Sequence, residues 1–119
     1  MRFLNTMTTC VLIAFASIAS AHSHLASSEP KANEVLSVAP ESITIHFKDA
    51  LRPKESIITV FDSAKKQVNT EDATVGEDKK TLTVPLPELT AGSYTVKWKA
   101  VCFCADHGVT SGTYKFTVK

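Results

Sequence analysis

The clearest indication of the fold is the segment from Leu89 to Phe103, which reads Leu-Thr-Ala-Gly-Ser-Tyr-Thr-Val-Lys-Trp-Lys-Ala-Val-Cys-Phe. From Ser93 onward its apolar side chains recur at every second position, the period of a β-strand with one face in a core. The residues expected on that face are Tyr94, Val96, Trp98, Ala100 and Cys102. Tyr94 follows a glycine turn at the start of the strand, which is typical of a tyrosine corner, where the hydroxyl bonds back to the upstream backbone.

Shorter segments with the same alternation lie on both sides of this strand. We expect them at 25–28, 42–47, 56–62, 67–75, 81–86 and 110–118, separated by turn residues. No stretch shows a helical period of useful length. About seven short strands at this spacing predict an all-β fold, a seven-stranded Greek-key immunoglobulin-like β-sandwich.

Residues 1–21 have the features of an export signal. Arg2 precedes an apolar run, from Cys10 to Ala16, that is too short to span a bilayer as a helix. The small residues Ala19-Ser20-Ala21 then form the pattern after which a signal peptidase cuts. We therefore expect this segment to be removed on export, leaving residues 22–119 as one periplasmic domain with no segment inserted in the membrane.

The remaining domain carries no excess charge. With Arg2 removed, the 13 basic side chains of the chain become 12, equal to the 12 acidic ones. A neutral domain without a basic stripe is not expected to bind nucleic acid. Removing 21 of the 119 residues leaves 98, enough for a single hydrophobic core.

His22 becomes the N-terminus of this domain and is expected to chelate a metal ion. Its free amine and its imidazole Nδ1 can close a six-membered ring on one ion once the amine has lost its proton. In a seven-strand sandwich the first strand begins where the sixth ends, so His22 is expected beside the loop that holds Asp106 and His107. Nitrogen and oxygen donors suit copper(II), and residues 22–119 contain no methionine, which excludes a thioether copper(I) site.

Several motifs of the domain are similar to those of one family. They are His22 at the cleavage site, Ser27-Ser28-Glu29-Pro30, Ile45-His46-Phe47, Ala91-Gly-Ser-Tyr-Thr-Val-Lys-Trp98 and Ser111-Gly-Thr-Tyr-Lys-Phe-Thr-Val118. Together they resemble the CopC-type periplasmic copper-binding (copper resistance) proteins over nearly all of the domain. The resemblance implies a β-sandwich that binds copper(II) through the N-terminal amine and imidazole and through an Asp-x-His pair before the last strand.

His22 and Asp106 match the ligands of that family, whereas the second histidine does not. The family pattern Asp-x-His-x-x-x-Gly would place it at position 108, which is glycine in this chain. His107 is therefore our candidate for the second imidazole by proximity alone. A flexible Gly108 would let the loop re-aim that side chain.

Cys102 and Cys104 lie in the interval from Trp98 to Asp106, which is two residues longer than the family usually has. Their spacing puts both on the same face of an extended strand. Three interpretations stay open. Cys102 continues the core face as a small hydrophobe, or the pair forms a disulfide, which requires a bulge, or the pair is a soft copper(I) site beside the copper(II) site.

His24 supports a competing copper site. A free amine with histidine at the third position, as in His22-Ser23-His24, can wrap copper(II) with two deprotonated backbone amides and the His24 ring. This arrangement needs no fold. It cannot share one ion with a site made of His22, Asp106 and His107.

Two further polar residues lie near the expected site. His46 alternates away from Ile45 and Phe47 in a strand, so we expect a structural role for it. Asp49 follows that strand at the same end and is expected to hold the N-terminal amine or a copper ligand in position.

These features predict a copper(II) carrier or buffer in copper resistance or homeostasis, without catalytic turnover. Its expected partners are a membrane copper transporter or another periplasmic copper protein, and we expect a monomer. Two alternatives remain. One is an enzyme like the polysaccharide monooxygenases, which also use an N-terminal histidine chelate, and the other is a metal-free immunoglobulin-like interaction module.

Overall fold

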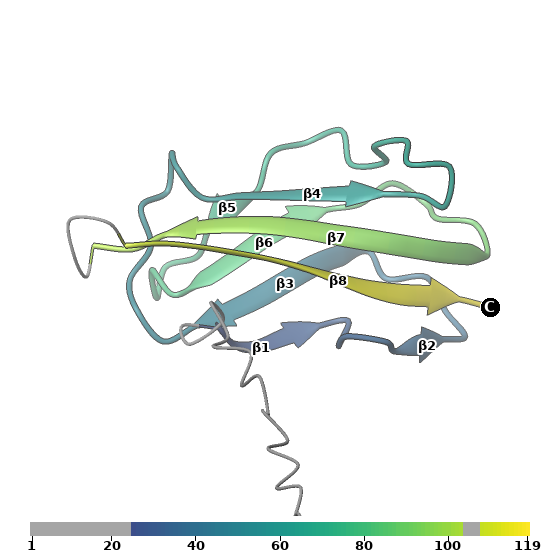
Figure 1. Ribbon diagram of the computed structural model, residues 1–119, viewed down its shortest axis with the longest axis horizontal. Helices are drawn as coiled ribbons and strands as arrows, with labels where there is room; N and C mark the ends of the chain where they lie inside the picture. Colours follow the sequence, from purple (N-terminus) through teal and green to yellow (C-terminus); the bar gives the residue numbers. More distant parts are fainter. Residues whose placement is uncertain (1–24, 104–107) are drawn as a thin grey trace, which may run out of the picture.

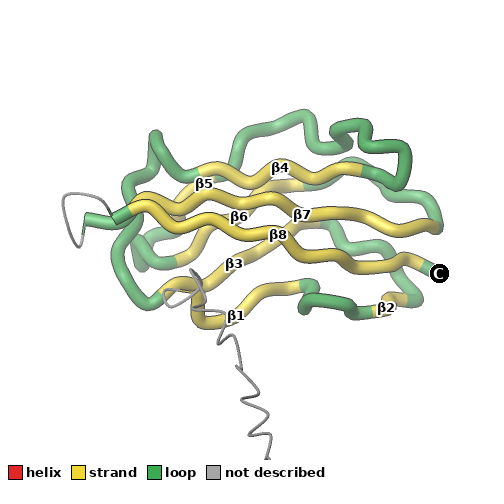
Figure 2. The backbone as a smooth tube through the Cα atoms, viewed as in Figure 1, coloured by secondary structure: helices red, strands yellow, loops and turns green. Residues whose placement is uncertain are grey.

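Eight strands in two four-stranded sheets form the part of the chain that the computed structural model describes, residues 25–103 and 108–119 (Figure 1). The strands are β1 (Leu25–Glu29), β2 (Val35–Leu36), β3 (Ser42–Phe47), β4 (Ile57–Phe61), β5 (Thr74–Val75), β6 (Thr81–Pro85), β7 (Gly92–Val101) and β8 (Val109–Val118). One sheet has the order β1-β3-β6-β5 and the other β2-β8-β7-β4. Turns and loops connect them, and the described residues contain no helix, hence none that could cross a bilayer (Figure 2).

The all-β, two-sheet architecture confirms the expected fold class, but the expected count of seven strands is wrong for the described residues. The additional strand is β2, which pairs in parallel with the end of β8. It arises because β1 leaves its neighbour β3 after Glu29. The next residue, Pro30, has no amide hydrogen to give to a ladder, and the chain crosses to the other sheet. The Greek-key, immunoglobulin-like assignment stays a prediction.

The strand expected at 67–75 is reduced to β5, and the segment before it joins β4 through the β-bridge of Gln67 to Phe61 and through the side chain of Asn69. Asn69 is buried beside β4, where its Oδ1 accepts a hydrogen bond from the Val60 amide at 2.9 Å. Its Nδ2 donates to the Ile58 carbonyl at 3.4 Å. These bonds satisfy polar groups along the outer edge of β4 without a neighbouring strand, so this edge is protected from pairing with another chain.

The core lies between the sheets and consists of every second residue of the long strands, as the alternation predicts. All the side chains expected inward between positions 94 and 102 are buried. The opposite sheet contributes Ile43, Ile45, Phe47, Leu82 and Val84. Phe47 meets Trp98 edge to face across the core, with 5.3 Å between ring centroids. Burial of apolar surface, worth ~25 cal/mol per Å², is the main stabilising contribution here.

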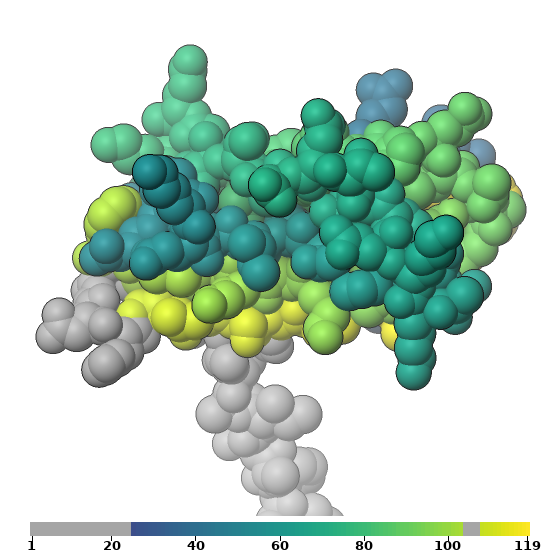
Figure 3. All heavy atoms as spheres, turned by 90° about the horizontal axis from the view of Figure 1, so that it is seen from above, coloured from purple at the N-terminus to yellow at the C-terminus, as the bar shows by residue number. Residues whose placement is uncertain are grey.

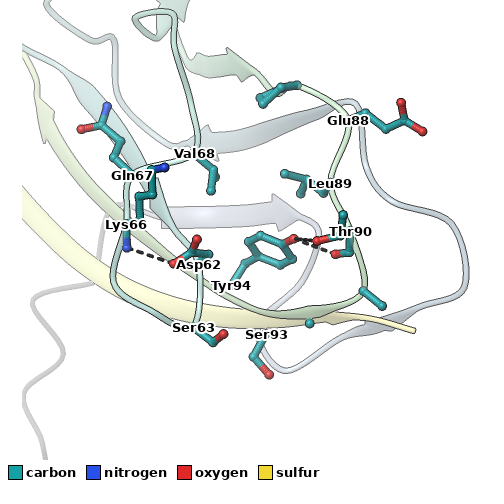
Figure 4. Close-up of a pocket in the computed structure, with 13 residues that line it drawn as sticks. Asp62, Ser63, Lys66, Gln67, Val68, Glu88, Leu89, Thr90, Ser93 and Tyr94 are labelled. Atoms are coloured by element: carbon teal, nitrogen blue, oxygen red, sulfur yellow. Dashed lines mark hydrogen bonds between the residues drawn. The ribbon is translucent and has the colours of Figure 1, made fainter.

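The expected tyrosine corner is confirmed at the start of β7. The Tyr94 hydroxyl donates a hydrogen bond to the Thr90 carbonyl at 2.6 Å (Figure 4). Gly92 between them has a φ of 151°, a conformation that residues with a side chain rarely adopt. The ring of Tyr94 also stacks on Phe116 of β8, at 5.4 Å between centroids. The turn, β7 and β8 are therefore held together at one point.

Gly112 leaves room for the only tryptophan of the chain. It lies opposite Trp98 in the ladder of β7 and β8, and a Cβ built on Gly112 would lie 2.6 Å from the indole ring. The indole therefore rests directly on the backbone of β8. This close approach leaves Trp98 only 4% exposed.

We expect Gly112→Ala to lower the free energy of unfolding by about 1–3 kcal/mol, the usual cost of adding a methyl group to a filled core. Urea unfolding followed by far-ultraviolet circular dichroism measures the change. Gly76→Ala is the matched control, because the nearest atom to its added Cβ lies at 3.4 Å, an ordinary contact. An equal loss of stability in the two variants would contradict the assignment.

Candidate metal centre

One end of the sandwich brings together the start of β1, the connection after β3 and the end of β7. Leu25 pairs with Phe47, the last residue of β3. Four residues later Leu51 makes a β-bridge to Cys102, directly after β7. The first described residue of the domain and the last described residue before position 104 therefore both lie beside the same short connection. β3 and β7 both end toward the left-hand side of Figure 1.

Backbone and side-chain hydrogen bonds hold this end in place. The amide of Arg52 donates to the carbonyl of Val101 at 2.6 Å, and the amide of Phe103 donates to the carbonyl of Ala50 at 3.0 Å. Ser56, 2% exposed, accepts a hydrogen bond from the Val101 amide at 3.1 Å and donates one to the Arg52 carbonyl at 3.0 Å. Sequence reasoning did not single out Ser56, since a serine at the start of a strand gives no signal of burial.

Most of the predicted copper ligands lie outside the described residues. These are His22, His24, Cys104, Asp106 and His107. The proposed signal peptide, residues 1–21, lies outside them as well. Within 25–103 and 108–119, no group of three or more histidine, cysteine, aspartate or glutamate side chains is placed to hold a metal ion. The ligand set therefore stays a prediction, and the structure contributes the position of its flanks.

Cys102 is the one predicted site residue whose surroundings are described. Its side chain is 5% exposed and continues the inward face of β7 after Ala100. It is also disulfide-bonded. The core interpretation of Cys102 is thus confirmed, and its sulfur is oxidised. Pairing with Cys104 stays a prediction, because Cys104 lies outside the described residues. Because its sulfur is engaged in a disulfide bond, Cys102 has no thiolate to offer to copper(I) in this oxidised form.

His46 has polar neighbours on the outer face of its sheet. Its Nδ1 lies 3.3 Å from the Thr81 hydroxyl, which donates to Asp78 Oδ2 at 2.7 Å. The hydrogen bond from Thr81, followed by the one from the Lys80 amide, lowers the pKa of Asp78 below its ordinary value. Asp78 also accepts from the Thr81 amide and so closes the turn before β6. This network is consistent with the structural role expected for His46.

The pocket in Figure 4 lies at the opposite end of the molecule. It encloses about 390 Å³ beside the tyrosine corner and is lined by residues such as Asp62, Lys66 and Glu88. Among the residues that the structure describes, neither histidine nor cysteine lines it. One oxygen of Asp62 already accepts hydrogen bonds from the amides of Ala64 and Lys66. Eight residues of extended strand, roughly 26 Å, separate Tyr94 from Cys102, so this pocket is not part of the candidate metal centre.

The two packed sheets form a β-sandwich, and the family is shown by direct comparison. The model of the CopC domain matches residues 25–119, so this chain belongs to the CopC domain family. Protein YobA of Escherichia coli K12 is 36% identical over 101 residues, covering 83% of this chain and 80% of YobA. Copper resistance protein C of Pseudomonas syringae pv. tomato is 34% identical over 109 residues, covering 86% and 84%.

Solved structures agree with this assignment. The crystal structure of CopC from Methylosinus trichosporium OB3b superposes with a TM-score of 0.73 at 33% identity, covering 81% of this chain and 92% of that one. PcoC from Escherichia coli, described as a methionine-rich copper resistance protein, gives a TM-score of 0.69 at 32% identity, with 81% and 97% covered. In contrast to that description, both methionines of the present chain, Met1 and Met7, precede residue 22.

We expect Cys102 to resist alkylation in the exported protein until a reductant is added, because its thiol is consumed in the disulfide. Mass spectrometry after iodoacetamide treatment, with and without prior reduction under denaturing conditions, measures the modified fraction. A fully alkylated Cys102 in the unreduced, denatured protein would show that the bond is absent. The Cys102→Ser, Cys104→Ser variant is the control for labelling elsewhere.

Proposed function

We propose that this protein is a periplasmic copper(II) carrier or buffer that serves copper resistance or homeostasis. Its copper is cargo, which it binds and releases without turnover. Membership of the CopC domain family and the copper resistance proteins among its relatives support this function. The single observation that carries it is the convergence of the start of β1 and the end of β7 on the connection from Phe47 to Leu51.

The proposed ligands come from the two segments that adjoin these flanks. After cleavage behind Ala21, His22 supplies its amine and imidazole, and Asp106 and His107 supply a carboxylate and a second imidazole. Two nitrogens from one residue bind as a chelate, so the second bond forms at a high effective concentration. Asp49, in the connection between Phe47 and Leu51, is proposed to hold the N-terminal amine or a ligand in place.

The choice of copper(II) follows from the donor atoms. The proposed set contains nitrogen and oxygen, which suit copper(II) in a tetragonal arrangement. Soft donors are scarce, since residues 22–119 hold no methionine and the sulfur of Cys102 is in a disulfide. A copper(I) site at Cys102 and Cys104 would therefore require reduction first. The proposed exchange partners are a membrane copper transporter or another periplasmic copper protein.

We expect one added residue before His22 to weaken copper(II) binding by more than the ~10- to 100-fold that loss of a ligand-orienting group usually costs. The extension moves the amine away and destroys the six-membered chelate. Competition titration against a copper(II) chelator, with quenching of the single tryptophan as the signal, gives the affinity, and mass spectrometry gives the stoichiometry, expected to be one. Equal affinity of the extended chain and the chain beginning at His22 would rule out the chelate.

We expect Asp106→Ala and His107→Ala each to weaken copper(II) binding while leaving the unfolding midpoint in urea unchanged. His24→Ala and His46→Ala are the controls and should have much smaller effects, since His46 is engaged with Thr81. Electron paramagnetic resonance reports the loss of a nitrogen ligand in His107→Ala. If His24→Ala abolishes binding and the loop variants do not, the wrapping site formed by His22-Ser23-His24 is the correct one.

A further inference from the structure

Exposed apolar side chains gather next to the candidate metal centre. Among the described residues, three of the five large exposed hydrophobic side chains are Ile57, Phe103 and Val109, which are 50%, 57% and 52% exposed. Ile57 pairs with Lys99 and Val109 pairs with Val101, so both project from the outer face of the β2-β8-β7-β4 sheet. Ile57, Phe103 and Val109 thus belong to three separate segments of the chain, which lie together where β7 ends.

A hollow of about 500 Å³ opens beside Ile57 and Val109. It is lined by Ile57 and Val109, by Cys102, and by the charged residues Arg52 and Lys54, among others. Figure 3 shows the segment before β4, in blue-teal, at the same end of the molecule as the yellow-green ends of β7 and β8. The surface here is therefore concave and partly apolar, unlike a flat solvated sheet face.

The charges around the hollow are mainly positive. Among the described residues, Arg52, Lys54 and Lys99 line it together with a single carboxylate, Glu55, which leaves an excess of two positive charges. Glu55 is partly neutralised by Arg52, whose Nε lies 3.8 Å from its Oε2. The guanidinium of Arg52 also lies over the ring of Phe103, 4.7 Å from its centroid. Arg52 thus places its positive charge directly against the apolar ring of Phe103.

The sheet behind this hollow has the same sign of charge. The ranges of β4, β7 and β8 include Lys97, Lys99 and Lys115 and no aspartate or glutamate. The exported domain is neutral as a whole, so its acidic residues are concentrated elsewhere. A positive field over this face attracts a negatively charged surface before contact and raises the rate of association.

We propose that Arg52, Lys54, Ile57, Lys99, Phe103 and Val109, called here the cationic end patch, dock the acidic surface of a protein that exchanges copper with this one. The proposal rests on the proposed function and names the surface used by its partner. Aromatic and arginine side chains over a small hollow are typical of the centre of a protein interface. Recognition of anionic lipid generally uses about four to eight clustered basic residues, whereas this patch has three and lies beside the carboxylate of Glu55.

The position of the patch explains why docking there would serve transfer. Cys102 lines the hollow and Phe103 belongs to the patch, and both directly precede the loop that carries the proposed ligands Asp106 and His107. A partner seated on the patch would bring its own copper ligands beside that loop. Because the patch itself holds no proposed ligand, changing it should affect the rate of transfer and leave the affinity for copper unaltered.

Copper transfer to two synthetic peptides tests the proposal. Both carry the copper(II)-binding head Gly-Gly-His, followed by four aspartates in one and four serines in the other. Starting from the copper-loaded protein of residues 22–119, stopped-flow recovery of Trp98 fluorescence gives the rate. We expect the acidic peptide to take copper about tenfold faster at low ionic strength, the lower end of electrostatic steering, and the advantage to disappear at high salt.

Charge reversal locates the effect. In Lys54→Glu, Lys99→Glu the advantage of the acidic peptide should be lost. The matched control is Lys65→Glu, Lys115→Glu, which makes the same change in net charge beside Phe61, at the other end of the same sheet face. The control should keep the advantage, and all variants should keep their copper(II) affinity. An equal loss in both double variants would overturn the proposal in favour of a general charge effect.

Photocrosslinking in the exporting cell tests for a protein partner directly. A benzophenone side chain at position 57 should crosslink to protein, and reversal of Lys54 and Lys99 should reduce the yield. A benzophenone at Thr83, on the other sheet, is the control. Adducts of phospholipid, adducts of a second copy of this chain, or equal yields from the two positions would each overturn the proposal. If the unaltered protein binds no copper, the proposed function fails, whereas the crosslinking still decides whether the patch docks a protein.

Discussion

The register of β7 against β8 is the constraint on which the rest of the structure depends. Ten residue pairs, from Gly92 with Val118 to Val101 with Val109, hold these strands together. A slip of one residue would turn every inward side chain of β7 to solvent. Two contacts exclude such a slip, because only Gly112 leaves space under Trp98 and the Tyr94 corner anchors the beginning of the strand. The same register decides that Cys102 points into the core where β7 ends.

The candidate metal centre follows from how this end is closed. Hydrogen bonds from Ser56, Arg52 and Phe103 tie the connection between β3 and β4 to the end of β7. The connection in turn lies next to the start of β1. The described flanks of the two proposed ligand segments, Leu25 and Phe103, therefore lie beside one connection. The disulfide at Cys102 removes one soft donor from this end, in keeping with the copper(II) site that we propose.

In the proposed carrier, the residues that bind copper are different from the residues that dock the partner protein. The proposed ligands are His22, Asp106 and His107, which lie outside the described residues. The cationic end patch lies on and beside β4, β7 and β8, and on the connection between β3 and β4. The patch is thus held by the sheet and needs no ordering when a partner arrives, which lowers the entropic cost of association. In the docking that we propose, positive charge around an apolar hollow would increase the rate of encounter, and the weakness of exposed ion pairs would let the partner leave after transfer.

The sequence by itself determined the all-β class, the inward face of β7, the tyrosine corner and the family, because these depend on local period and on short motifs. It also indicated that the first strand and the sixth expected strand meet at one end, since alternating strand directions require it.

Tertiary structure decided what depends on partners far apart in the chain. The side chain of Asn69 binds the backbone of β4, and Val35–Leu36 becomes a strand only because the edge of β8 that faces away from β7 lies beside it. Ser56 is buried only because Val101 lies against it, and Ile57, Phe103 and Val109 form a patch only after pairing brings three segments together. No local pattern encodes these contacts, because each residue involved has an ordinary sequence neighbourhood and obtains its role from the segment packed against it.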